Sequence, residues 1–311
     1  MSLSLKTTAA ESLQAYVQDF SEELLTELFV GFKTAPLMTV HEGVKGKIAL
    51  TSMTTADLVR RYSSSFASVA DAFTFAPRNL EVVDAKVDLT IIPKEFESSY
   101  LGQFRKKGQD PIDLPFEGYI IRQALAKIQS EMEYAVWRSV PAVAPAATDK
   151  LNALFKGFKK ILTDETASLS PVTTGAITSS NAVASVENTY AALGDAYKDN
   201  TVDIFMSPAD KVLFIQDYRN QYGKYFEKAD GTINLETGDA NIHVLSGVPK
   251  NCILVTPREN LHYGFDGAGD AGLFNFEQED RKIKMWIDFK IGVNFGMLNS
   301  SIIAVNNQWT V

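Results

Sequence analysis

The chain has a single cysteine, Cys252, among its 311 residues. No intrachain disulfide can therefore form, and such cysteine usage is typical of a reducing compartment. No apolar run approaches the ~20 residues needed to cross a bilayer, and the opening residues MSLSLKTTAAES lack the basic start and apolar core of a signal peptide. We therefore expect a soluble protein that is made in the cytoplasm and has no contact with a membrane.

An excess of positive charge is also missing. The net charge is -8 and the isoelectric point is about 5.1. Because neutralising phosphates requires a clustered basic surface, this balance argues against a dedicated nucleic-acid binder, although weak or enclosed contact with DNA stays open. With 45% hydrophobic and 22% charged residues the composition is that of a globular protein. The length predicts about two domains or one elaborate domain.

Residues that carry chemistry are few and scattered. The three histidines, His41, His243 and His262, stand apart in the sequence, whereas zinc requires three or four clustered ligands. Cys252 opens the apolar run CILVT, which favours a buried, unreactive thiol. No nucleophile elbow and no P-loop occurs. The sequence therefore predicts no catalytic, cofactor-binding or metal-binding residue.

Two local patterns imitate ligand sites. Residues 267–272, GAGDAG, match G-x-G-x-x-G, but the following sequence is strand-like and Asp270 would set a negative charge against phosphate. We expect a surface turn there. An acidic loop could hold a cation but lacks the spacing of an EF-hand, which favours a solvated turn. Its acidic residues are Asp230, Glu236 and Asp239.

Residues 282–295, KIKMWIDFKIGVNF, alternate apolar and polar side chains over their whole length. Successive strand side chains point to opposite faces, so the pattern predicts one strand with a dry face and a wet face. At ~3.3 Å per residue such a strand is about 43 Å long, well beyond the usual five or six residues. Only Trp286 and Gly292 interrupt the polar face.

Further long elements accompany this strand. Residues 80–92 alternate with a change of phase that predicts a bulge near Val82–Val83. Residues 115–139 carry an apolar stripe at helical spacing, and about 24 residues make a helix of ~36 Å, matched to the strand. Residues 9–30 predict another helix, with Thr8 and Glu11 as a capping box and Gly31 at its end. That helix could pack on its own domain or lie on a neighbouring molecule.

A Pro/Ala-rich stretch, residues 140–150, is the best domain boundary. After it the elements become shorter. A helix is expected over 178–198, and residues 202–208 predict a buried strand feeding a helix whose cap is Ser207. Residues 145–250 therefore suggest a compact α/β unit inserted between the long helix and the long strand. We find no internal repeat and no low-complexity tract.

Three stretches resemble the major capsid proteins of tailed phages with the Hong Kong 97-type fold. Residues 172–208 resemble the opening of the axial domain, residues 116–137 are placed like the spine helix, and residues 248–266 resemble the passage that returns the chain to the peripheral domain. The resemblance covers most of residues 75–305. It implies an α+β fold with a helical arm (1–35), an extended loop (36–75), an elongated peripheral domain (76–144 and 250–311) and an inserted axial domain (145–249).

The resemblance implies a structural role: a major capsid protein of a tailed bacteriophage or prophage. Its copies would assemble as hexamers and pentamers into an icosahedral shell around double-stranded DNA, formed in the host cytoplasm and then part of the virion. Scaffold, portal and packaged DNA are the implied partners, with no cofactor. The alternatives are an encapsulin-like nanocompartment shell and an unrecognised α+β enzyme.

The sequence departs from parts of the family pattern. Only about 35 residues precede the hairpin region, which implies a separate scaffold or none. Some relatives cross-link through Lys–Asn bonds, and Lys45 and Lys47 lie in the expected loop, but no motif pairs them with Asn299, Asn306 or Asn307. Modest basic clusters could meet acidic patches on a neighbour. They are Arg60–Arg61, Arg105–Lys107, and Lys156 with Lys159 and Lys160.

Overall fold

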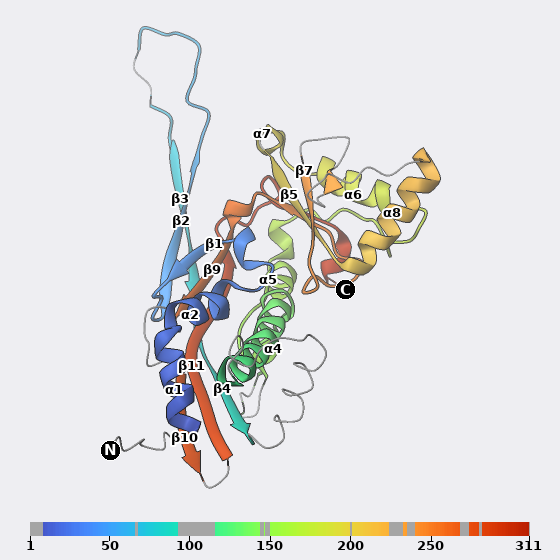
Figure 1. Ribbon diagram of the computed structural model, residues 1–311. Coiled ribbons are helices and arrows are strands. Elements are labelled where there is room, and N and C mark those ends of the chain that lie inside the picture. Colours follow the sequence, from blue (N-terminus) through green and yellow to red (C-terminus); the bar gives the residue numbers. More distant parts are fainter. Residues whose placement is uncertain are drawn as a thin grey trace, which may run out of the picture.

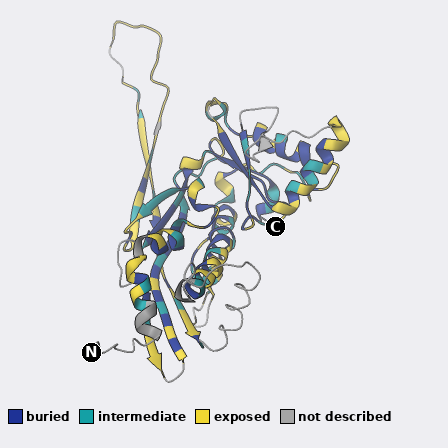
Figure 2. Cartoon of the chain, viewed as in Figure 1, coloured by how far each residue is buried: buried dark blue, intermediate teal, exposed yellow. Residues whose placement is uncertain are grey.

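The computed structural model describes residues 9–65, 68–92, 116–143, 146, 150–199, 201–223, 233–234, 240–267, 274–279 and 282–310. The molecule has three parts (Figure 1): an elongated sheet with helices along it, a narrow hairpin that projects from one end, and a second sheet with its own helices. Buried residues follow both sheets and their covering helices, whereas the outer part of the projecting hairpin is exposed (Figure 2).

The long predicted strand is present as β11, Lys282–Phe295. Its apolar side chains are buried at every second position, as the alternation predicts. β4 (Val83–Ile91) pairs antiparallel with one edge of β11, while β10 (Phe274–Glu279) and β9 (Leu261–Asp266) pair with the other. β1 (Thr39–Glu42) extends the sheet parallel to β9. β11 is thus the central strand of a five-stranded sheet.

The expected long helix is α4, Phe116–Arg138. Its stripe of buried side chains joins the same core as the dry face of β11. The stripe is Ile121, Leu125, Ile128, Met132 and Ala135. Because both elements are long and their apolar faces meet, the core extends along the length of the sheet.

The helix expected over residues 9–30 is two helices, α1 (Ala9–Asp19) and α2 (Ser21–Val30). The chain leaves helical geometry at Phe20, with φ −113° and ψ 19°. Both helices contact α4, but α1 also contacts β10, whereas α2 stacks Phe29 on Phe265 of β9, with 4.4 Å between ring centroids. The two helices therefore cover different parts of the same sheet (Figure 1).

The second sheet has the order β12-β8-β5-β7-β6. β5 (Val202–Met206) is entirely buried and leads into α8 (Pro208–Tyr222), as predicted. The cap is also confirmed, because Ser207 accepts a hydrogen bond from the Asp210 backbone N–H at 3.2 Å. The other strands are β6 (Ile233–Asn234), β7 (Ala240–Val244), β8 (Leu254–Thr256) and β12 (Ala304–Val305).

The helix expected over 178–198 is shorter and divided. α6 (Ala182–Ala191) and α7 (Asp195–Lys198) are separated at Gly194, which has extended geometry. Gly194 lies so close to Ser301 that an added Cβ would be 2.8 Å from the Ser301 carbonyl oxygen. This close approach holds the chain out of the helix.

Short helical segments connect the larger elements. One of these segments is a short α-helix, α5 (Phe158–Asp164). The 3-10 turns are η1 (Ala35–Leu37), η3 (Leu151–Ala153), η4 (Thr166–Ser168), η5 (Arg258–Asn260) and η6 (Asn307–Thr310). β8 and β12, which belong to the expected peripheral range 250–311, pair within the second sheet. The domain limits given above stay a prediction.

β2 (Lys47–Thr55) and β3 (Phe73–Glu81) pair antiparallel (Figure 1). We call these two strands and the loop between them the projecting hairpin. The bulge expected near Val82–Val83 is wrong, because the chain there passes from one strand into another. β3 pairs with β2 and β4 pairs with β11, while the Val82 N–H donates to the Gly46 carbonyl oxygen at 3.0 Å. Val82 closes the base of the hairpin, which explains the change of phase.

Candidate assembly surfaces

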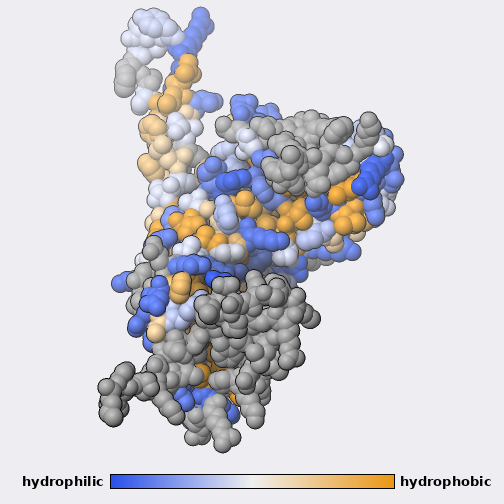
Figure 3. Space-filling model, viewed as in Figure 1, coloured by the Kyte–Doolittle hydropathy of each residue, from blue (hydrophilic) through white to orange (hydrophobic). Residues whose placement is uncertain are grey.

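One face of the outer hairpin is apolar and uncovered. Met53 lies opposite Phe75, and Phe73 lies opposite Thr55, so these side chains share a face. Met53, Phe73 and Phe75 are 52%, 54% and 62% exposed. Figure 3 shows hydrophobic residues along the hairpin. Exposed apolar side chains grouped on one face in this way are typical of surfaces that contact another molecule.

The loop beyond these strands continues that surface. Val59 and Tyr62 are almost fully exposed, Leu58 is half exposed, and Arg60 and Arg61 lie between them in the sequence. An isolated two-stranded hairpin is at best marginally stable in water. The hairpin therefore gains stability when its apolar face is buried against a partner.

The base of the hairpin is seated on the wet face of the long sheet. Gly264 of β9 lies directly opposite Gly292 of β11, and together they leave a bare patch. An added Cβ at Gly292 would be 2.0 Å from the Glu81 carbonyl oxygen, and one at Gly264 would be 2.9 Å from Leu80. Gly292, noted above as an interruption of the polar face, is therefore where the hairpin crosses β11.

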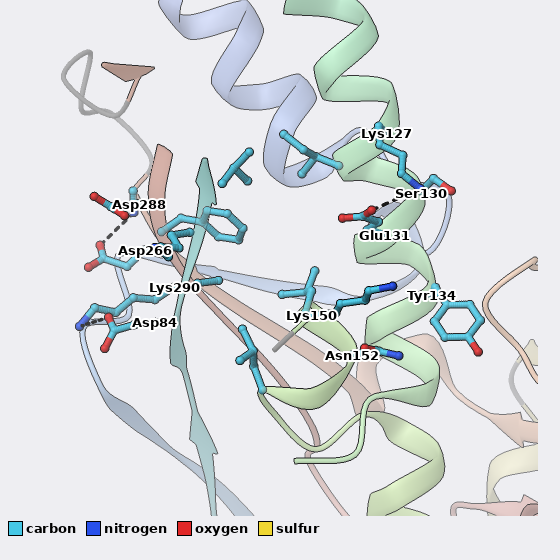
Figure 4. A pocket seen from close by; sticks show the side chains of 18 of the residues that line it. Asp84, Lys127, Ser130, Glu131, Tyr134, Lys150, Asn152, Asp266, Asp288 and Lys290 are labelled. Atoms are coloured by element: carbon cyan, nitrogen blue, oxygen red, sulfur yellow. Dashed lines mark hydrogen bonds and ion pairs between the residues drawn. The ribbon is translucent and has the colours of Figure 1, made fainter. Parts of the chain in front are cut away.

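A cleft of about 1270 Å³ lies between α4 and the β4–β11 edge of the sheet (Figure 4). Its polar residues form ordinary ion pairs: Lys290 with Asp84 at 3.3 Å and Lys127 with Glu131 at 3.2 Å. Figure 4 shows Lys127 and Glu131 on the helix side of the cleft and Lys290 on the sheet side. The arrangement does not set a nucleophile beside a general base, so it offers no evident catalytic chemistry.

Two histidines that are isolated in the sequence meet in the structure. His41 Nε2 and His262 Nδ1 are 2.9 Å apart, because β1 pairs in parallel with β9. Burial, with the adjacent His41, lowers the pKa of His262 to about 4. The residues are 221 positions apart, so no local pattern could have predicted the contact.

The third histidine supports the second sheet. His243 Nε2 lies 2.7 Å from Asp203 Oδ1, and Arg258 Nε donates to Asp203 Oδ2 at 2.8 Å. Burial opposes ionisation of Asp203, but the hydrogen bonds from His243 and Arg258 outweigh it and lower the pKa of the carboxyl. In the part of the chain described above, no three His, Cys, Asp or Glu residues gather as a metal site.

Cys252 is 1% exposed, and burial raises the pKa of its thiol to about 12. This agrees with the expected unreactive thiol.

Asn306, one of the asparagines considered for cross-linking, is fully buried and its Nδ2 donates to the Asn251 carbonyl oxygen at 2.7 Å. Asn306 is therefore not accessible to a lysine of another copy. Lys47, one of the lysines considered, forms an ion pair with Glu81 at 2.5 Å.

In the basic cluster at residues 156–160, Lys156 and Lys160 both pair with Asp164, which offsets part of its positive charge. Several residues singled out from the sequence lie outside the described residues. These are Thr8, Arg105–Lys107, Asp230, Glu236, Asp239 and Asp270.

No helix within the described ranges is both long enough and apolar enough to span a bilayer.

No protein-family model matches the chain, and no curated protein sequence matches it. Solved structures do match. A chain of the satellite phage P4 procapsid, solved with its size determination (Sid) protein, is similar over 93% of this chain and 98% of its own length, with a TM-score of 0.55 and 11% identity.

Two further structures agree with this match. A chain from the capsid of an empty GTA particle covers 88% of each chain with a TM-score of 0.53 and 13% identity. One from Microbacterium phage Oxtober96 covers 88% of this chain and 90% of its own, with a TM-score of 0.50 and 10% identity. The chain thus has the α+β, Hong Kong 97-type capsid fold, which confirms the fold expected from the sequence.

Proposed function

We propose that this chain is the major capsid protein of a tailed bacteriophage or prophage. Its copies assemble as hexamers and pentamers into an icosahedral shell that encloses double-stranded DNA. The observation that carries the proposal is the projecting hairpin, which extends an uncovered apolar face away from a body with the capsid fold. The similar capsid chains, each matched over almost its full length, support it.

Burying the apolar face of the hairpin against a second copy of the chain is more favourable than leaving it in solvent. Fully burying an exposed side chain of this size is worth about 1.5–3 kcal/mol. Met53, Phe73 and Phe75 are about half exposed, so each has roughly half of that left to gain. A few kcal/mol per hairpin is modest for one contact, but a closed shell repeats the contact in every subunit.

A surface that projects from one copy and is received by a different surface on the next makes a heterologous contact. Heterologous contacts close into rings when the rotation between copies allows it. Hexamers and pentamers are such rings, and shells combine them. The elongated sheet and α4 supply the reach that a subunit requires when it meets several neighbours at once.

The role is structural, and the proposed location is the virion capsid after assembly in the host cytoplasm. Scaffold and portal proteins are the expected assembly partners. The net charge of -8 argues against tight binding of the enclosed DNA, which would require clustered basic residues, so contact with the packaged DNA is proposed to be weak and non-specific. An encapsulin-like shell would enclose protein cargo, and the contents of purified particles distinguish the two.

Electron microscopy of the purified full chain, across protein and salt concentrations, tests the proposal. We expect rings, tubes or shells, with nucleic acid in particles isolated from cells that carry the complete phage. The variant Phe73→Ser/Phe75→Ser should form few or no particles, because it removes both aromatic side chains of the apolar hairpin face without changing a buried core residue.

Val212→Ser/Tyr222→Ser on α8 is the matched control, since these side chains are 53% and 54% exposed away from the hairpin. It should assemble like the wild-type chain. A wild-type chain that stays monomeric under every condition, with and without co-expressed phage assembly genes, would overturn the proposal. Equal assembly of both double variants would exclude the hairpin as the contact.

A further inference from the structure

Arg78 connects the projecting hairpin to two other parts of the molecule. Its Nη1 and Nη2 donate to the two carboxylate oxygens of Glu165, each at 2.7 Å. Its Nε donates to the Phe295 carbonyl oxygen at 3.1 Å, and Nη2 also reaches Asn294 Oδ1 at 3.2 Å. One side chain of β3 thereby contacts the end of β11 and the turn between α5 and η4.

This contact has the geometry of a rigid connection. A planar guanidinium bound to both oxygens of a carboxylate restricts distance and orientation together, which a lysine cannot do. The side chains of Arg78 and Glu165 are 20% and 38% exposed. Hydrogen bonds from Arg78 lower the pKa of Glu165, which favours the carboxylate form of that side chain.

The other contacts of the hairpin lie nearer its base. Near the base, Asn294 Nδ2 donates to the Asn79 carbonyl oxygen at 2.7 Å, and Leu80 is buried. These contacts attach the hairpin base to the long sheet, where Glu81 and Leu80 also lie against Gly292 and Gly264. Arg78 lies further along β3 from this base, and its pair with Glu165 attaches that part of the hairpin to the turn between α5 and η4.

We propose that Arg78 is a positioning residue that fixes the direction of the projecting hairpin through Glu165, and so determines the angle at which a second copy is received. The second half of this inference rests on the proposed function. The first half concerns a single chain and stands without it. Neither residue needs to contact the neighbouring copy.

Pulsed electron–electron resonance between two spin labels tests the first half. Thr55→Cys places one label at the outer end of β2, and Ala191→Cys places the other on α6. Both sites are exposed, and the buried Cys252 does not compete for label. The labelled full chain is diluted into unlabelled chain so that only distances within one molecule are measured.

We expect one narrow distance distribution for the otherwise native chain. Arg78→Gln and Glu165→Gln should each shift and broaden it, because either change removes the bidentate pair. Lys47→Gln is the matched control, since it breaks an exposed ion pair, Lys47 with Glu81, at the same hairpin base and should leave the distribution unchanged. Circular dichroism verifies that every variant is folded.

Unchanged distributions in both Arg78→Gln and Glu165→Gln would overturn the inference. If one of these two variants fails to fold, the distance distribution of the other still tests whether the pair fixes the direction of the hairpin. Particle images of the same variants address the second half: irregular or mixed sizes are expected where the native chain forms uniform particles. A native chain without particles would count against the proposed function and leave the distance measurement valid.

Discussion

At the scale of single residues, polar groups placed inside the core find partners that connect distant parts of the chain. Glu133 of α4 accepts hydrogen bonds from the backbone N–H and the hydroxyl of Thr34, at 2.9 and 2.8 Å. Trp137 Nε1 donates to the same hydroxyl at 2.9 Å. A buried network whose members are all satisfied favours one arrangement, since any other leaves a polar group unpaired. It secures the residues after α2 against the long helix.

His262 should make stability depend on pH. Its pKa is about 4 in the folded chain and about 6.5 when unfolded, so the unfolded state binds more protons between these values. The stabilising effect of the neutral imidazole is present above about pH 6.5 and is lost as the pH falls toward 4, by at most about 3 kcal/mol.

Urea denaturation at a series of pH values, with native chain and His262→Asn in parallel, measures this contribution. Carboxylates titrate in both proteins, so the difference between the two curves reports the contact between His41 and His262. The free energy of unfolding should fall more steeply in the native chain as the pH decreases from 6.5 to 4. Parallel curves would contradict the assignment.

At the scale of elements, the architecture follows from two long pieces and one crossing point. β11 has 14 residues and α4 has 23, so they run for about 46 Å and about 35 Å. The projecting hairpin crosses β11 where Gly264 and Gly292 lie opposite each other. A strand of that length leaves room along its wet face for a second layer of chain.

Gly292→Ala should displace the hairpin base and destabilise the protein. The new Cβ would meet the Glu81 carbonyl oxygen at 2.0 Å, and overpacking of this kind costs about 1–3 kcal/mol. Urea denaturation gives the loss in the free energy of unfolding, and limited proteolysis should find the hairpin cleaved faster.

Gly46→Ala is the control for that variant. It lies at the same base, has no positive φ, and an added Cβ there would have nothing within 4 Å. Its stability should stay within about 0.5 kcal/mol of the native value. Equal effects of the two substitutions would mean that the crossing point is not close-packed.

At the scale of the whole molecule, one side of the second sheet packs into the core of the long sheet, while its other side has a core of its own. The largest buried cluster contains residues of the long sheet and also Phe205, Leu254 and Val305 of the second sheet. Trp137 lies at this junction, with ring centroids 5.2 Å from Phe158 and 5.6 Å from Phe205. A core that is continuous across the junction couples the folding of both parts.

Trp137→Ala should therefore weaken both parts together. Removing a fully buried aromatic side chain costs about 3–5 kcal/mol, and unfolding should remain one transition in which all probes coincide. Trp286→Ala on the partly exposed wet face of β11 is the control and should cost much less. Two separate transitions in the native chain, with only one shifted by Trp137→Ala, would contradict a shared core.

The sequence alone determined the elements whose signals are local. The period of two over residues 282–295, the helical stripe of α4, and the strand–cap–helix order around Ser207 are each decided within a few residues by side-chain direction and backbone hydrogen bonding. The capsid fold was predicted from the resemblance of residues 116–137, 172–208 and 248–266 to phage capsid proteins, with which the order of these elements agrees. The unreactive Cys252 could be inferred for the same reason, from its apolar neighbours in the sequence.

Only the tertiary structure decided which distant residues meet. The contact between His41 and His262, the pair of Arg78 with Glu165, and the break at Val82 depend on how strands pair and cross, which no local periodicity contains. The same holds for the separation of α1 from α2, which follows from the two surfaces that they cover. A side chain's environment is set by the path of the whole chain, because packing joins residues that the sequence keeps far apart.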